Sequence, residues 1–158
     1  MNDEYRTLLL DAYKGELLGE ALFGAFAARE SGEHAEKLRV LQRIEGTTAE
    51  HLRPMLDAAG VEVTAEDEAT TRAQGSEIGE AGIEWDAFVK GLHDALPSFL
   101  ASFVRLRSIA PDSSDPALVA LINHEQAINA FAELELSGSA DRSLAVLHWH
   151  LESVSSAV

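Results

Sequence analysis

The sequence predicts an all-α protein: a four-helix bundle of two antiparallel hairpins, with an additional helix in the crossover region. Three observations lead to this fold class. Segments rich in alanine, leucine and glutamate carry apolar residues at the helical period, strand patterns are nearly absent, and glycine or proline breaks the pattern at few places. With 158 residues the chain has the length of a single domain, which we place over 1–158.

The turn signals divide the chain into five helical segments. We expect helices over about 3–30, 33–59, 84–107, 116–136 and 140–156, with a linker over 60–83. A Ser-Gly pair at 31–32 leaves so short a turn that the first two helices should form an antiparallel hairpin. Asp115-Pro116 is a strong helix start, and a Ser-Gly pair at 137–138 makes the last two helices a second hairpin.

The connection between the hairpins differs in character from the rest of the chain. Glycines punctuate a charged, threonine-rich stretch over 60–82, where we expect at most one short helix, opened by Thr64 with Asp67 as its capping partner. The helix over 84–107 should be interrupted near Pro97. Its apolar face carries no carboxylate, so we interpret it as core or as a dimer face and not as a cofactor site.

Composition excludes several classes of function. Asp and Glu number 27 against 12 Lys and Arg, a net charge of −15, which argues against nucleic acid or an anionic membrane as a partner. The absence of cysteine excludes disulfides and thiolate-bound metals. We find neither a signal-peptide pattern after Met1 nor an apolar run long enough to cross a bilayer, and therefore expect a cytoplasmic protein.

Three glutamates stand where soluble helices carry leucines. Glu20, Glu45 and Glu125 each have apolar neighbours at spacings of three, four and seven residues, which places them on the inward face of three helices. A buried carboxylate costs several kcal/mol, roughly, unless a charge or hydrogen bonds compensate it. Carboxylates meeting at mid-height of a bundle therefore predict a bound divalent cation, with Glu16 either a further ligand or a solvent-edge residue.

Imidazole is a natural companion ligand for iron, manganese or zinc among carboxylates. The last helix offers His148 and His150, of which His150 has the more apolar neighbours and is the better inward candidate. His124 adjoins Glu125 but is rotated from it by a full 100° about the helix. We interpret His124 as a residue behind the ligands or on the surface.

With these residues the chain resembles the ferritin-like superfamily, whose di-metal members carry a glutamate on one helix, Glu-x-x-His on the next, and then the same pair again. In this resemblance Glu20 stands for the first glutamate, and Glu45-Gly-Thr-Thr48 stands where the first Glu-x-x-His belongs. Glu125 stands for the third-helix glutamate, and Leu147-His-Trp-His150 for the final motif. The resemblance covers about 5–59 and 115–157.

Neither Glu-x-x-His motif is intact, because Thr48 replaces one histidine and Leu147 replaces one glutamate. Four remaining ligands would leave a mononuclear site, a labile pair of metals completed by water and Glu16, or a vestigial site.

Two hypotheses of different classes follow. The first is a ferritin-like bundle that binds one or two ions of iron or manganese, before zinc, with an oxidoreductase or metal-handling role. The metal ligands would be Glu20, Glu45, Glu125 and His150, with Glu16 as a bridging carboxylate. The second is a metal-free bundle with a vestigial site that acts as a homodimeric interaction module, through the helix over 84–107 or the face of Trp149.

Overall fold

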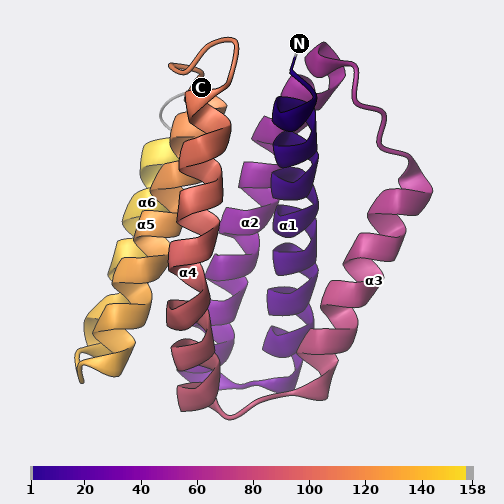
Figure 1. Cartoon of the computed structure of the whole chain (residues 1–158). Helices are drawn as coiled ribbons and strands as arrows, with labels where there is room; N and C mark the ends of the chain where they lie inside the picture. The colour runs from indigo at the N-terminus through magenta and orange to yellow at the C-terminus, as the bar shows by residue number, and fades with distance from the viewer. Residues whose placement is uncertain (1, 156–158) are drawn as a thin grey trace.

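A computed structural model describes residues 2–155, and all regular structure in this range is helical (Figure 1). The elements are α1 (Asp3–Arg29), α2 (Gly32–Ala59), α3 (Ala65–Ala81), α4 (Trp85–Ser108), α5 (Pro116–Leu136), the 3-10 turn η1 (Ala140–Arg142) and α6 (Ser143–Ser155). The all-α prediction is confirmed for the described residues. Position 156, the predicted end of the last helix, lies outside the described residues. None of the described helices is both long enough and apolar enough to span a membrane.

Local signals in the sequence account for most helix ends. Asn2 caps α1 by accepting a hydrogen bond from the backbone N–H of Glu4, and Asp115 caps α5 ahead of Pro116. Gly60 ends α2 with positive φ, a conformation that glycine adopts at little cost. Pro97 lies inside α4, which is one continuous helix, so the predicted interruption there is wrong.

The crossover contains more structure than the sequence pattern predicted. Thr64 and Asp67 form the predicted capping box, but the helix they open, α3, runs for 17 residues. Its glycines serve helix packing: a Cβ on Gly75 or Gly79 would collide with the backbone carbonyls of Leu18 and Leu22 in α1. The sequence reading took these glycines as breaks, whereas they let α3 lie directly against α1.

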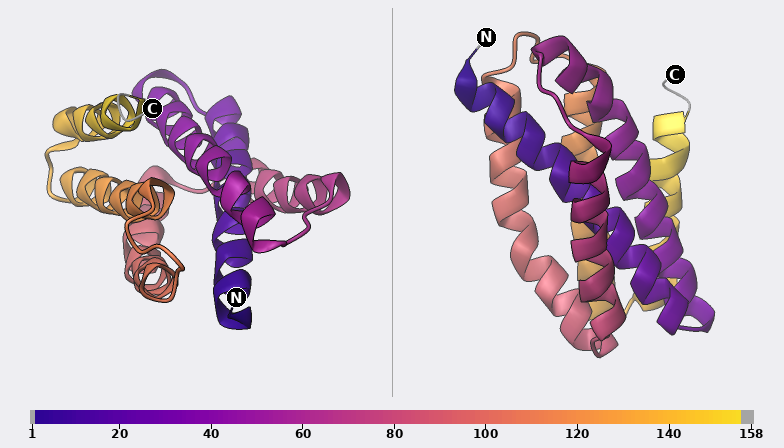
Figure 2. Two further views of the ribbon diagram at one scale, coloured as in Figure 1. Left: turned by 90° about the horizontal axis from the view of Figure 1, so that it is seen from above. Right: turned by 90° about the vertical axis from the view of Figure 1, so that its right-hand side faces the viewer.

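Four helices form the ring of the bundle: α1 packs on α2, α2 on α5, α5 on α4, and α4 closes the ring against α1. Neighbours in this ring run in opposite directions (Figures 1 and 2). α3 packs outside the ring along α1, and α6 packs outside along α5 and α2. The sequence pattern had placed the last helix in the bundle and treated 84–107 as the addition, so the structure reverses these two positions.

The apolar core is divided into two clusters along the helices. One contains Leu9, Leu52 and Leu118, and the other contains Phe26, Leu38 and Phe131. In α2 and α5, the residues between the clusters in sequence include buried polar side chains, Glu45 on α2 and the pair His124 and Glu125 on α5. On α1, the buried Glu16 lies beside Leu17, the last α1 residue of the first cluster. The bundle therefore carries a polar layer near its middle, and this layer contains the candidate site.

Candidate metal centre

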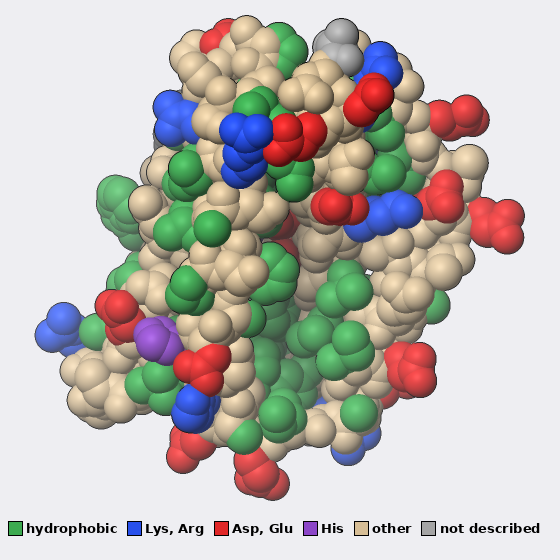
Figure 3. All heavy atoms as spheres, viewed as in Figure 1, with side chains coloured by type: hydrophobic (Ala, Val, Ile, Leu, Met, Phe, Trp, Pro, Cys, Tyr) green, Lys and Arg blue, Asp and Glu red, His purple; other side chains and the backbone are tan. Residues whose placement is uncertain are grey.

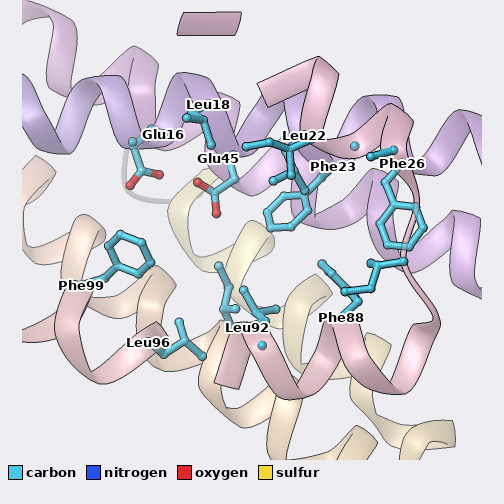
Figure 4. A pocket seen from close by; sticks show the side chains of 18 of the residues that line it. Glu16, Leu18, Leu22, Phe23, Phe26, Glu45, Phe88, Leu92, Leu96 and Phe99 are labelled. Atoms are coloured by element: carbon cyan, nitrogen blue, oxygen red, sulfur yellow. The ribbon is translucent and has the colours of Figure 1, made fainter. Parts of the chain in front are cut away.

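Three helices each bring a buried carboxylate into the polar layer. Glu16 lies on α1, Glu45 on α2 and Glu125 on α5, and all three side chains are buried. Figure 4 shows Glu16 and Glu45 directed into the space between α1 and α4. The sequence predicted such a meeting for Glu20, Glu45 and Glu125, whereas the structure buries Glu45 and Glu125 together with Glu16.

A histidine completes the group. His124 is fully buried, and its Nε2 lies 3.2 Å from Glu16 Oε2, 3.7 Å from Glu125 Oε1 and 4.0 Å from Glu45 Oε1. Ligand atoms of Glu16, Glu45 and His124 all lie within 4.8 Å of one another, so these residues could hold one metal ion. The surface placement considered for His124 is wrong.

The second ring nitrogen of His124 determines how the first one is used. Nδ1 lies 2.5 Å from the backbone carbonyl oxygen of Leu121, and because a carbonyl only accepts, we infer that Nδ1 carries the hydrogen. In neutral imidazole, Nε2 then presents a lone pair to carboxylate oxygens, which are acceptors themselves. Acceptors that face one another in this way need a proton or a cation between Nε2 and the carboxylates. At metal sites, a histidine commonly binds the metal through one ring nitrogen while the other donates a hydrogen bond to a carbonyl oxygen.

Three buried atoms at the centre have no hydrogen-bond partner: Glu16 Oε2, Glu125 Oε2 and His124 Nε2. Within residues 2–155, the three carboxylates form no ion pair except with His124. Buried polar groups are nearly always paired, so three unpartnered atoms within one group of side chains are what a bound ion or proton would satisfy.

Burial and mutual repulsion change the acidity of the carboxyls. Burial raises the pKa of Glu16 well above its usual range, and the charge of Glu125 adds to this, while contact with Glu45 opposes it. Burial likewise raises the pKa of Glu45 well above its usual range, with the charge of Glu16 as the next cause. The pKa of Glu125 rises to about 7, chiefly through burial, although the nearby His124 works against the rise. A bound cation would offset the cost of ionising all three buried carboxyl groups.

The backbone of α1 leaves room for one of these carboxylates. Gly19 has no side chain, and a Cβ built on it would lie 2.6 Å from Glu45 Oε2 and 2.9 Å from Glu45 Cδ. Any other residue at this position would push the Glu45 carboxylate out of its place. Gly19 is thus part of the geometry of the centre.

The structure leaves the other predicted ligands outside this group. Glu20 is partly exposed and forms an ion pair with Arg72 of α3. His150 is buried, as its apolar neighbours indicated, but it lines a separate cavity between α5, α6 and the end of α2, where burial lowers its pKa to about 4. His148 is half-buried near Glu20 and Glu50. The imidazole among the carboxylates is therefore that of His124.

A signal for His124 was present in the sequence. Leu121, His124, Ile128 and Phe131 follow one another at spacings of three and four residues, and the structure buries all four. α5 has a wide buried surface because α2, α4 and α6 all pack on it. Adjacent positions such as 124 and 125 therefore both point inward, which a single narrow apolar stripe does not allow.

Comparison of the chain with family models, with curated proteins and with solved structures found no match in any of the three. The class of protein is accordingly defined by its fold and site alone: an all-helical protein with a buried carboxylate and histidine group.

Proposed function

We propose that this protein binds one divalent transition-metal ion between Glu16, Glu45, Glu125 and His124, with iron or manganese preferred over zinc. The observation that carries the proposal is the buried group of three carboxyls and one imidazole with unpartnered oxygen and nitrogen atoms. A mixed set of carboxylate oxygens and one imidazole nitrogen suits ions of intermediate hardness, which include both preferred metals.

The residues fit such an ion in number and in chemistry. One nitrogen and three carboxylates satisfy about four to seven coordination positions, depending on whether each carboxylate binds through one oxygen or two. The hydrogen bond from His124 Nδ1 to Leu121 fixes the ring with Nε2 toward the carboxylates. Gly19 leaves space for Glu45, so the sequence of α1 accommodates the site as well as supplying Glu16.

A ferritin-like relationship remains part of this proposal, with a changed assignment of residues. Glu16 takes the place of Glu20 as the first-helix glutamate, Glu45 keeps its place, and His124 with Glu125 supplies the ligands of the later helix. A bound iron or manganese ion would give the protein redox or metal-handling chemistry, which is the class of function we propose. The chain itself would position the ion near the two apolar clusters.

Metal content under matched loading tests the proposal. We expect purified protein offered Fe²⁺, Mn²⁺ and Zn²⁺ to retain about one ion per chain, as one four-residue ligand set implies, and Glu45→Gln to lose it. The control is Glu50→Gln, an exposed glutamate on the same helix, which should bind metal like the wild type. Equal metal content in Glu45→Gln and wild type, or none in either, would overturn the proposal.

The alternative is a metal-free interaction module in which protons occupy the centre. Two observations favour it: the raised pKa values of Glu16 and Glu45, and the indole of Trp149, which is 70% exposed beside the cavity lined by His150. Under this alternative, wild-type protein would carry no metal, Glu45→Gln would raise its thermal stability, and Trp149→Ser would convert a dimer to a monomer.

A further inference from the structure

An apolar groove leads from the surface to the carboxylates. It has a volume of about 810 Å³ and lies between α1, α3 and α4. Figure 3 shows hydrophobic side chains gathered along the hollow between α4 and α3. Glu16 and Glu45 lie at one end of the row of labelled side chains in Figure 4, and Phe26 and Phe88 lie at the other. Glu16, Glu45 and Glu125 all line it, so the groove and the candidate metal centre are continuous.

The mouth of the groove is apolar as well. Ile78, Ile83 and Phe99 line it and are among the most exposed large apolar residues of the described chain, at 55%, 51% and 49% exposure. Such side chains facing water around a cavity indicate a binding site for an apolar ligand. On α4, Phe88, Leu92 and Leu96 belong to the same surface, with Phe88 at the end away from the carboxylates and Leu96 and Phe99 at the end of Glu16 (Figure 4).

The charges of the groove restrict the ligand further. Every charged residue that lines it is a glutamate: Glu16, Glu45, Glu77 and Glu125. Within residues 2–155, no arginine, lysine or histidine lines the groove. The three carboxylates of the centre also outweigh the charge of one divalent ion, so the anionic group of a fatty acid or phosphorylated lipid would meet net negative charge there. The volume falls within the range of about 300–1,000 Å³ typical of small-molecule sites.

We infer that the centre acts on uncharged, elongated hydrocarbon molecules, which enter through this groove and place one end beside Glu16, Glu45 and Glu125. For the end of the ligand beside the carboxylates, this inference rests on the proposed metal function. Binding of the rest of the ligand depends on the groove alone. The apolar face of α4, which the sequence left open as core or dimer surface, is on this account the wall along which the ligand lies.

Two glycines permit a test that leaves the ligands of the metal untouched. Gly91 on α4 and Gly15 on α1 line opposite walls of the groove, and a Cβ on either would meet nothing within 4 Å. Gly91→Phe should therefore enter the groove without a clash at its Cβ, and Gly91→Ala is its matched control. If circular dichroism shows that Gly91→Phe does not fold, Gly15→Leu fills the groove from the other wall.

Binding is measured with the neutral fluorophore N-phenyl-1-naphthylamine, displaced by 1-decanol, decanoate or decylammonium. We expect 1-decanol to displace the probe, decanoate to compete poorly, and the plugged variant to bind at least about tenfold more weakly than Gly91→Ala. Unchanged binding in the plugged variant, or better competition by either charged chain than by 1-decanol, would overturn the inference. So would a wild-type dimer that Gly91→Phe converts to a monomer, because the groove would then be a contact between copies.

Loading with Mn²⁺ connects the groove to the centre. In the Mn²⁺-loaded protein, proton NMR signals of 1-decanol should broaden progressively toward one end of the decanol molecule, and loading with diamagnetic Zn²⁺ in place of Mn²⁺ should abolish the broadening but retain probe binding. Probe binding with no metal in the wild type would overturn the proposed function and leave the groove as an apolar site. Metal binding without broadening of the ligand signals would overturn the inference and leave the proposed function intact.

Discussion

Two buried charged clusters in this protein have opposite electrostatics. Around Lys37, which is fully buried on α2, every charge has a partner: its Nζ lies 2.5 Å from Glu135 Oε1, 2.7 Å from Glu33 Oε1 and 3.0 Å from the carbonyl oxygen of Ala140. The second carboxylate oxygen of Glu135 accepts a hydrogen bond of 3.0 Å from the indole of Trp85. At the carboxylate and histidine centre, three atoms have no hydrogen-bond partner among the described residues.

The pKa values of the two clusters differ accordingly. Burial alone would raise the pKa of Glu135, but hydrogen bonds from Lys37, Ser143 and Trp85 outweigh it, and the pKa falls below its usual value. At Glu16 and Glu45 burial dominates, and their pKa values rise. The Lys37 cluster is complete without a ligand and holds helices together, whereas the other cluster has the composition of a binding site.

The largest effect should come from removing the cation of the complete cluster. Lys37→Met leaves Glu135 buried without its counter-charge, and we expect a loss of about 3–5 kcal/mol in the free energy of unfolding. Urea denaturation followed by circular dichroism measures it, with exposed Arg39→Met on the same helix as the control. A loss no larger than that of the control would show that Lys37 is not compensating a buried charge.

A smaller effect, of opposite sign, should appear at the centre of the metal-free protein. The pKa of Glu125 rises from 4.5 to about 7 on folding, so the stability contributed by its proton is full below pH 4.5 and is lost as the pH rises through about 7. Glu125→Gln cannot ionise and should gain about 3 kcal/mol over wild type across this window, from about 1.4 kcal/mol per pKa unit.

Denaturation of both proteins across this pH range tests the expected gain. His150 affects stability with the opposite pH dependence. Burial lowers its pKa from 6.5 to about 4 on folding, so the stability that it contributes when neutral is lost as the pH falls. His150 is present in both proteins, so the difference between variant and wild type removes its contribution. A difference that stays constant with pH would contradict a buried, ionisable Glu125.

The smallest effect concerns the space beside Glu45. Gly19→Ala should displace the Glu45 carboxylate and weaken metal binding by about tenfold or more, as loss of a supporting group commonly does. Gly15→Ala is the matched control, because it lies one helical turn away on α1 and its Cβ meets nothing within 4 Å. Titration with Mn²⁺ followed by calorimetry compares the two, and equal affinities would remove Gly19 from the centre.

The sequence predicts part of this arrangement through local periodicity. Glu45 and Glu125 have apolar neighbours at helical spacing and are buried with them. The capping signals locate most helix ends. Glu16 and Glu20 share one helical face, but their surroundings differ because Arg72 of α3 forms an ion pair with Glu20. This long-range partner lies in a segment interpreted as a linker, so the pattern within α1 could not choose between the two glutamates.

The choice of the fourth helix has a similar origin. α4 and α6 both carry apolar faces, and the closing contact with α1 belongs to α4 because α3 returns the chain to the far end of the bundle first (Figure 1). His124 was missed for a related reason, since the width of the buried face of α5 depends on how many helices pack on it. Both facts are properties of tertiary packing that no single helix encodes.

The contact of α3 with α1 through Gly75 and Gly79 has one more consequence. The C-terminal half of α3 is a wall of the groove, and its distance from α1 is set by backbone atoms instead of by side chains. One added methyl group on Gly79 would move that wall outward and leave every metal-facing residue unchanged. If the proposed function holds, the residues that set the width of the groove differ from those that would hold the metal, so mutation could alter one property while preserving the other.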